Sequence, residues 1–181
     1  NPSNEEVCAI ISLGGKEDTN AAVKAAKDSF IKWWNISREN KLDLLNKLLM
    51  IYTKRSKEMA QAISTEMGAP KEWAIDQQSK TGENHIKTFI KKYSEFKFEK
   101  YYDESSKNYI SYEPIGVCGL ITPWNWPMNQ IALKVLPALA TGCTMVLKPS
   151  EIAPLSGILF AEMIDEAGFP SGVFNLVNGD G

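Results

Sequence analysis

The sequence predicts an α/β protein in which a parallel sheet follows an N-terminal helical layer and a protruding β-hairpin. Apolar residues recur at helical spacing through residues 1–95. Aromatic and polar residues then alternate over residues 96–113, as in paired antiparallel strands. From residue 114 to residue 181, short apolar runs alternate with helical segments. These three regions are the expected divisions of the chain, and the third is expected to be an incomplete domain.

Length and composition narrow the possible classes of protein. The chain has 181 residues, of which 44% are hydrophobic and 23% are charged, as is usual for a globular protein. The formal net charge of -2 predicts no general attraction to nucleic acid or to an anionic membrane. No stretch approaches the roughly 20 apolar residues that span a bilayer.

The cysteines and the N-terminus indicate where the protein resides. Cys8, Cys118 and Cys143 form no C-x-x-C pair, and their odd number argues against a disulfide framework. We therefore expect a cytoplasmic protein, and we predict no metal site. The first residue is not Met, and no secretory signal pattern follows it, so the front of the chain is expected to be trimmed.

The helical layer begins after an irregular start with a short predicted strand over residues 7–11. Asp18 and Thr19 are candidate N-caps for a first helix, whose apolar positions include Ala26 and Trp33. These positions recur at the spacing of one helix face.

Two further helices are expected before residue 96. Ser37 is a candidate N-cap for a helix with one apolar face that ends at Gly68. Pro70 stands where a first helical turn tolerates proline, and the helix that follows should reach about residue 93. This layer is amphipathic and carries no evident chemistry.

Residues 96–113 are predicted to form a hairpin with aromatic residues on one face. An antiparallel pair of this kind needs a covering surface. We therefore predict that the hairpin is a contact between subunits.

The last third of the chain predicts three strands joined by two helices. The strands are expected at residues 115–122, 143–147 and 173–177, and the helices at residues 127–140 and 154–167. The first strand is a continuous apolar run, which predicts burial on both faces. This order is that of the mononucleotide-binding half of a doubly wound, Rossmann-like sheet, with right-handed crossovers.

Ligands of such sheets bind beyond the carboxyl ends of the strands, so the first of these turns is a candidate site. Two prolines and two tryptophans surround Asn125 there. A rigidly held amide can donate a hydrogen bond to an oxygen that becomes negative during a reaction. The alternative is that Asn125 satisfies backbone groups of the turn while Trp124 and Trp126 lie in the core.

The second turn pairs Lys148 with Glu151. Together they can hold a diol such as a ribose, and the carboxylate would repel a 2′-phosphate. The alternative is a surface turn in which Ser150 and Glu151 lead into a helix. The third turn, at Asn178 and Gly179, could be a plain turn or the start of a glycine-rich loop. No G-x-G-x-x-G follows the first strand, where the standard dinucleotide fingerprint belongs, and this absence counts against a Rossmann domain.

Three segments closely resemble the aldehyde dehydrogenase superfamily. They are residues 113–127 (EPIGVCGLITPWNWP), residues 137–151 (PALATGCTMVLKPSE) and residues 168–181 (GFPSGVFNLVNGDG). Their order and separations are those of the family, which makes the match highly specific. The turn at residues 66–70 (EMGAP) is similar too, so the resemblance covers the whole chain.

The resemblance implies a non-classical Rossmann domain, which accounts for the missing glycine fingerprint. It implies that Asn125 donates to the oxyanion of the tetrahedral intermediate. It also implies a cofactor cleft with NAD as the cofactor, NADP being possible. The implied cleft residues are Ile121, Thr122, Pro123 and Trp124 through their backbone, Lys148 and Glu151 at the adenosine ribose, and Ser150 beside them.

The resemblance also implies the reaction of the parent protein. In the family a cysteine thiolate attacks the aldehyde, hydride passes to NAD(P)⁺, and a glutamate activates water to release the acid. Both groups lie downstream of the matched segment, and the first strands of the family are absent from its front. The 181-residue chain alone is therefore expected to be inactive. The parent is expected to be a homodimer or a homotetramer that takes an aldehyde of unspecified identity.

Two alternatives stay open. The chain could be a non-catalytic short partner that docks onto a full-length subunit through its hairpin. The parent could instead be an acylating, CoA-dependent semialdehyde dehydrogenase. Cys8, Cys118 and Cys143 are each interpreted as structural, and His85 as a surface or helix-packing residue.

Overall fold

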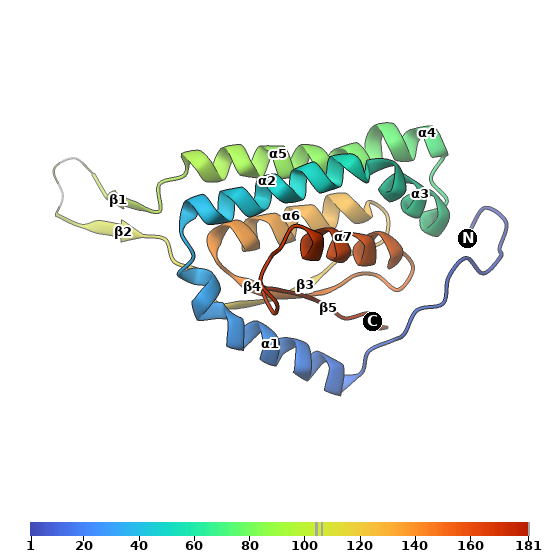
Figure 1. Cartoon of the computed structure of the whole chain (residues 1–181), viewed down its shortest axis with the longest axis horizontal. Helices are drawn as coiled ribbons and strands as arrows, with labels where there is room; N and C mark the ends of the chain where they lie inside the picture. The colour runs from blue at the N-terminus through green and yellow to red at the C-terminus, as the bar shows by residue number, and fades with distance from the viewer. Residues whose placement is uncertain (104, 106, 181) are drawn as a thin grey trace.

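A computed structural model describes residues 1–103, 105 and 107–180 of the chain. Its centre is a parallel sheet of β3 (Val117–Ile121), β4 (Thr144–Lys148) and β5 (Phe174–Leu176), hydrogen-bonded in the order β3-β4-β5. The strands alternate with helices along the chain, so the predicted α/β class is confirmed (Figure 1).

Helices cover both faces of this sheet. The crossover helices α6 (Pro127–Thr141) and α7 (Leu155–Glu166) lie on one side, and α1 (Lys16–Trp34) lies on the other (Figure 1). The buried hydroxyl of Thr144 donates to the Ala26 carbonyl at 2.8 Å and thereby ties β4 to α1. The central strand β4 is consequently buried over nearly its whole length.

The first strand differs from the prediction. β3 is only half-buried, and Ile121 at its end is 69% exposed. An apolar run was expected to be covered on both faces, but β3 forms the edge of the described sheet, with β4 on one side only. An apolar strand sequence favours a buried position, but it does not show which neighbouring elements cover the strand.

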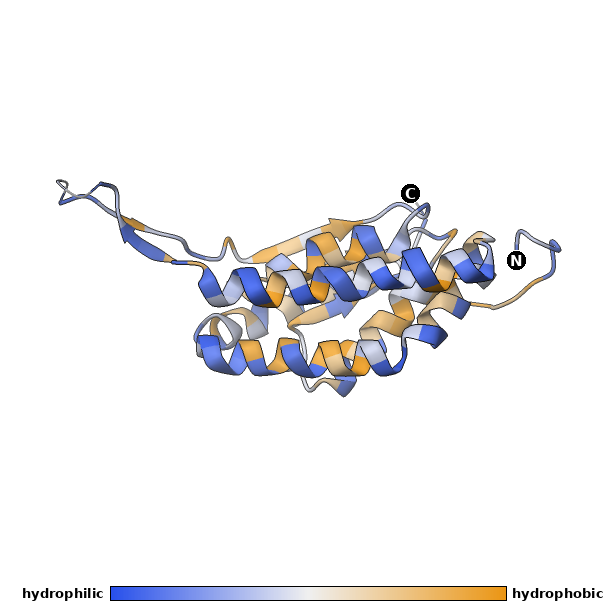
Figure 2. Ribbon diagram, turned by 90° about the horizontal axis from the view of Figure 1, so that it is seen from above, coloured by the Kyte–Doolittle hydropathy of each residue, from blue (hydrophilic) through white to orange (hydrophobic). Residues whose placement is uncertain are grey.

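An outer layer of helices packs over α6 and α7. It consists of α2 (Arg38–Lys54), α3 (Ser56–Met67), α4 (Lys71–Trp73), the π-helix η1 (Ala74–Ser79) and α5 (Lys80–Glu95). The outer helices carry interleaved hydrophilic and hydrophobic stretches in Figure 2, as expected of amphipathic helices with one inward face. The buried core runs without interruption from this layer to the sheet.

Two predicted helices are interrupted. The helix that Ser37 caps, by accepting from the Asn40 N–H at 3.2 Å, ends at Arg55, and α3 starts directly afterwards. Gly68 ends α3 in the left-handed conformation, as predicted, with φ of +74°. The helix after Pro70 contains the π-helix η1, and periodicity alone does not distinguish a π-turn from a continuous α-helix.

The N-terminal predictions were partly wrong. Residues 7–11 form no strand, and Val7 and Ile10 are 83% and 93% exposed. In the part of the chain that the structure describes, no strand lies beside this segment to supply ladder hydrogen bonds. The N-cap of α1 is Gly15, and Asp18 instead sits three residues inside the helix. There its carboxylate accepts from the Gly15 N–H at 2.8 Å.

The predicted hairpin is confirmed. β1 (Glu99–Tyr101) pairs antiparallel with β2 (Tyr109–Ser111), and the pair projects away from the body (Figure 1). Tyr101 and Tyr109 face each other across the strands with ring centroids 5.8 Å apart, and both rings are more than half exposed. Among the described residues, no helix is long and apolar enough to cross a membrane.

Candidate functional site

The carboxyl ends of the three strands meet at one edge of the sheet. Ile121 pairs with Lys148 in the register of β3 and β4, and the Thr122 N–H donates to the Lys148 carbonyl at 3.2 Å. The Val177 N–H donates to the Leu147 carbonyl at 2.9 Å on the other side. The turns after β3, β4 and β5 are therefore neighbours in space.

A cavity of 340 Å³ opens at this edge. The ends of β3 and β4 line it, together with Gly14 and Thr19 before and within the first turn of α1, and Val177, Asn178 and Gly179 directly after β5. Gly119 of β3 has no side chain to fill this space, and a Cβ added there would meet nothing within 4 Å. This edge is thus open to a ligand.

Lys148 and Glu151 lie close together in the structure. They are the two residues that the sequence predicted to hold a diol. The Lys148 ammonium donates to the Gly179 carbonyl at 2.7 Å and to the Glu151 carboxylate at 3.3 Å. Hydrogen bonding from the backbone N–H of Glu151 and from Lys148 lowers the pKa of the Glu151 carboxyl, which is therefore ionised at neutral pH. One cation thus links the turn after β4 to the loop after β5.

Ser150 shapes this turn from within. Its side chain is buried, and the hydroxyl oxygen accepts from the Ile152 N–H at 3.2 Å. The Ser150 carbonyl accepts from the Ala153 N–H at 3.1 Å. Ser150 therefore holds the conformation that presents Lys148 and Glu151.

Asn125 lies in the turn between β3 and α6, where it is exposed. Among the residues described, its amide has no hydrogen-bond partner, so it does not satisfy backbone groups of the turn. The adjacent Trp126 packs edge to face on Trp73 of α4, with centroids 5.0 Å apart. Trp124 is 45% exposed and is no core residue. The turn is anchored on one side while its amide stays available.

Two polar atoms at the strand ends are buried without a partner among the described residues. They are the Thr122 hydroxyl oxygen and the Asn178 side-chain oxygen. Buried polar atoms are normally hydrogen-bonded, so each unpaired one calls for an explanation. A polar ligand at the strand ends would supply one.

Sequence reasoning missed the contribution of the N-terminal segment to this edge. The Gly14 N–H donates to the Asn178 carbonyl at 2.7 Å, and a Cβ on Gly14 would approach Val177 Cγ1 to 2.7 Å. Only glycine permits this approach. The Gly14-Gly15 pair was the available signal, but nothing local indicated its partner.

Comparison with known proteins identifies the chain. The model of the Aldehyde dehydrogenase family matches residues 1–181. The chain belongs to this family. A 3-succinoylsemialdehyde-pyridine dehydrogenase of Pseudomonas sp is 48% identical over 182 residues, and a putative aldehyde dehydrogenase of Staphylococcus saprophyticus is 41% identical over 181 residues. Each match covers 100% of this chain and 38% of the relative, so the chain spans well under half the length of these family members.

Solved aldehyde dehydrogenases share the fold of the chain. The enzyme of Bartonella henselae superposes with a TM-score of 0.96 at 57% identity, covering 98% of this chain and 37% of that one. Aldehyde dehydrogenase C of Pseudomonas syringae, solved with NAD⁺ and octanal, superposes with a TM-score of 0.95 at 44% identity. That match covers 100% of this chain and 37% of the Pseudomonas syringae chain.

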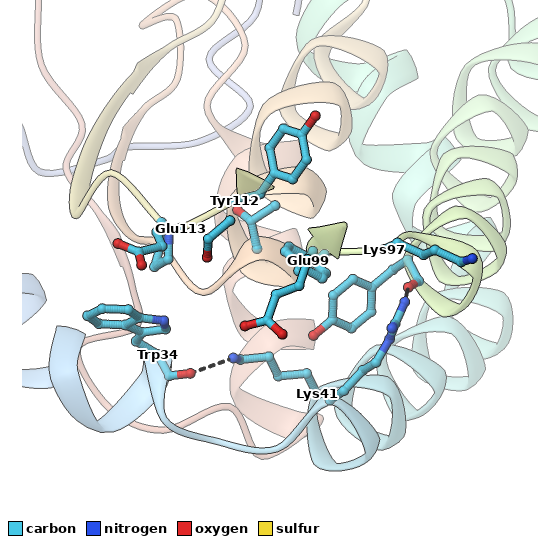
Figure 3. Close-up of a pocket in the computed structure, with 13 residues that line it drawn as sticks. Trp34, Lys41, Lys97, Glu99, Tyr112 and Glu113 are labelled. Atoms are coloured by element: carbon cyan, nitrogen blue, oxygen red, sulfur yellow. Dashed lines mark hydrogen bonds between the residues drawn. The ribbon is translucent and has the colours of Figure 1, made fainter. Parts of the chain in front are cut away.

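Another cavity of this aldehyde dehydrogenase chain lies away from the strand ends. It measures 540 Å³, lies at the base of the hairpin and shares no lining residue with the strand-end cavity (Figure 3). Lys41 faces it and donates to the Trp34 carbonyl at 2.9 Å, and burial lowers the pKa of this ammonium. None of the residues named for the family's cofactor cleft lines this space.

Among the described residues, the three cysteines and the single histidine of the chain show no arrangement that would activate them for catalysis. Cys143 is buried and Cys118 half-buried, while Cys8 is exposed in the N-terminal segment. Burial and the neighbouring Cys143 raise the pKa of the Cys118 thiol to about 11, which disfavours the nucleophilic thiolate. His85 lies 2.8 Å from the Asn129 side chain through its Nε2 atom, a contact between α5 and α6.

Proposed function

We propose that the full-length protein oxidises an aldehyde to a carboxylic acid with NAD, and that NADP can substitute. The observation that carries the proposal is the Lys148–Glu151 pair beside the strand-end cavity of an aldehyde dehydrogenase chain. A relative named for a semialdehyde and a neighbour solved with NAD⁺ and octanal support the same reaction class.

The residues at the strand ends fit a dinucleotide. Lys148 and Glu151 supply a donor and an acceptor for ribose hydroxyls. The side-chain oxygens of Thr122 and Asn178, which have no partner among the described residues, can form hydrogen bonds with a polar ligand. Ile121 lines the cavity at the end of β3, the backbone of residues 122–124 continues from it, and Ser150 supports the neighbouring turn. NAD, when bound, supplies the hydride acceptor, and this chain binds and orients it.

Asn125 serves the chemical step in this proposal. An exposed amide N–H without a protein partner can donate to the aldehyde oxygen as that oxygen gains negative charge. Because the donor is held by a turn anchored through Trp126, it needs little reorganisation. The attacking thiolate and the water-activating carboxylate are proposed to lie beyond residue 181.

The reaction is tested with the full-length protein, NAD and a panel of aldehydes, by following NADH absorbance. We expect aldehyde-dependent NADH formation, with acid as the product. The 181-residue chain alone should form none. A reading frame that stops directly after residue 181 would argue for the short docking partner, absence of turnover with every aldehyde would refute the proposed reaction, and an acyl-CoA product upon addition of coenzyme A would indicate the acylating alternative.

The quaternary arrangement is part of the proposal. The exposed tyrosines of the hairpin support a role as a subunit contact in a homodimer or homotetramer. We propose the same three divisions of the chain, at residues 1–95, 96–113 and 114–181. One hydrophobic core contains residues of both the first and the third division. A cytoplasmic location rests on the cysteine usage alone.

A further inference from the structure

A buried carboxylate of α3 reaches across to the first turn of α7. Glu66 is only 6% exposed, and its Oε2 accepts from the Leu155 N–H at 2.5 Å. The Ser156 N–H lies 3.2 Å from Oε1 and 3.3 Å from Oε2. Pro154, at the N-cap position of α7, makes no capping hydrogen bond of its own. Glu66 therefore satisfies two of the N–H groups that the first turn of the helix leaves without an intrahelical partner.

The same helical turn touches the candidate cofactor site. Gly157 lies one residue after Ser156, and a Cβ added there would lie 3.2 Å from the Pro149 Cβ. Pro149 stands between Lys148 and Ser150. A shift in the first turn of α7 is thus passed directly to the turn that presents Lys148 and Glu151.

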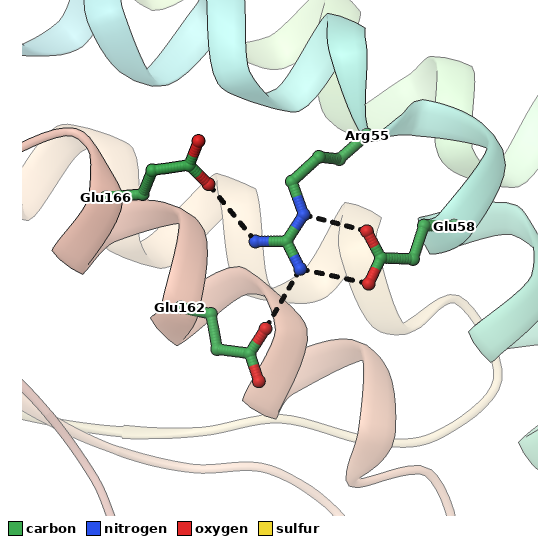
Figure 4. A network of polar contacts seen from close by, with 4 residues as sticks. All are labelled: Arg55, Glu58, Glu162 and Glu166. Carbon is green, nitrogen blue, oxygen red and sulfur yellow. Dashed lines mark hydrogen bonds and ion pairs between the residues drawn. The ribbon is translucent and has the colours of Figure 1, made fainter.

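A different contact holds the far end of α7. Arg55 binds Glu162 at 2.9 Å and Glu166 at 3.3 Å, and also pairs with Glu58 (Figure 4). This cluster secures α7 against the outer helices without touching its first turn. The two ends of the helix can therefore be released separately.

We propose that Glu66 is a positioning residue for the cofactor site: by fixing the start of α7 it places Pro149 and, with it, the Lys148–Glu151 pair. This inference rests on the proposed cofactor function. Glu66 makes no contact with the cofactor in this role. Its effect should appear in cofactor binding and leave aldehyde recognition unchanged.

The test measures NAD affinity of the full-length protein by quenching of tryptophan fluorescence. Glu66→Ala should raise the Kd for NAD at least about tenfold, because small displacements of binding groups are costly. Glu66→Gln keeps one acceptor oxygen and should show an intermediate increase. In steady-state kinetics the KM for NAD should rise in both variants, with the KM for aldehyde unchanged.

Two controls separate positioning from general destabilisation. Ile63→Ala removes fully buried volume one turn earlier on α3, and it should lower the melting temperature without changing the Kd for NAD. Arg55→Gln releases the far end of α7 and should also leave this Kd unchanged.

The outcomes distinguish the two proposals. Wild-type protein that fails to bind NAD refutes the proposed function. Wild-type protein that binds NAD, together with Glu66→Gln and Glu66→Ala variants that bind it equally well, overturns the positioning role. If Glu66→Ala does not fold, Glu66→Gln alone decides in the same way. An equal loss of affinity in Ile63→Ala would also overturn it.

Discussion

At the scale of single residues, we propose that Asn125 and Glu151 carry the chemistry that the chain contributes. Each is exposed, and each lies directly beyond the end of a parallel strand. Asn125 has a free amide among the described residues, while Glu151 is held by Lys148. The two side chains therefore call for different tests.

Asn125→Ala should lower the kcat of the full-length protein by about 10²–10³, because one donor to a developing oxyanion is lost. The Kd for NAD should not change, since the amide acts on the aldehyde oxygen. Stopped-flow NADH formation and fluorescence titration measure the two quantities. Asn46→Ala, on the exposed face of α2, is the matched control and should change neither. A normal kcat in Asn125→Ala would remove this residue from the mechanism.

Glu151→Gln should shift cofactor preference towards NADP. The lowered pKa of Glu151 keeps it ionised, and a carboxylate repels a 2′-phosphate placed beside it. The ratio of NAD to NADP affinity should therefore fall by about fivefold. Lys148→Ala should weaken both cofactors. An unchanged ratio in Glu151→Gln would defeat the assignment of specificity to this carboxylate.

At the scale of secondary-structure elements, the link between α3 and α7 depends on a buried acid. Burial raises the pKa of Glu66 from 4.5 to about 7, although hydrogen bonds from Ser156 and Leu155 act in the opposite direction. The folded protein therefore holds this proton at a higher pH than the unfolded chain does. The stability that this proton contributes is complete below pH 4.5 and is lost as the pH rises through 7.

Glu66→Gln should remove this dependence on pH. Between pH 5 and pH 8 the melting temperature of the wild type should fall relative to that of the variant. The corresponding loss in the free energy of unfolding is as much as about 3 kcal/mol. Thermal melts of both full-length proteins across this range measure it. Parallel pH profiles for the two proteins would show that Glu66 titrates normally.

At the scale of the whole molecule, the hairpin is the element least connected to the body. It extends away from the sheet and helices (Figure 1), and the rings of Tyr101 and Tyr109 pack on each other with centroids 5.8 Å apart. A pair of short strands is marginally stable alone, so a covering subunit would stabilise it. This surface is where assembly can be tested without disturbing the cofactor site.

The double variant Tyr101→Ser with Tyr109→Ser should weaken subunit association. Loss of two large exposed aromatic side chains removes apolar area that an interface would bury. Sedimentation velocity should show a smaller assembly at low micromolar concentration, while NAD binding persists. Tyr102→Ser, at the strand end and 70% exposed, serves as a single-site comparison. Wild-type assembly in the double variant would exclude this face of the hairpin from the contact.

Local patterns predicted the elements better than their surroundings. Alternating apolar and helical segments identified β3, β4, β5 and the helices between them, because each pattern depends on neighbours in sequence. The break at Arg55 escaped prediction, since Arg55 pairs there with Glu162 and Glu166 of α7, which lie far away in sequence. The exposure of β3 escaped it too, because edge position is a property of the sheet and not of the strand.

The family, the order of the elements and the candidate residues at the strand ends could all be identified without coordinates. These follow from local spacing and from motifs that must be contiguous to work. Only the tertiary structure showed that Gly14 lies against Asn178 and that Glu66 caps α7, contacts that span 164 and 89 positions (178 − 14 and 155 − 66). Such contacts depend on how layers pack, and no local pattern encodes which distant group will satisfy a buried donor.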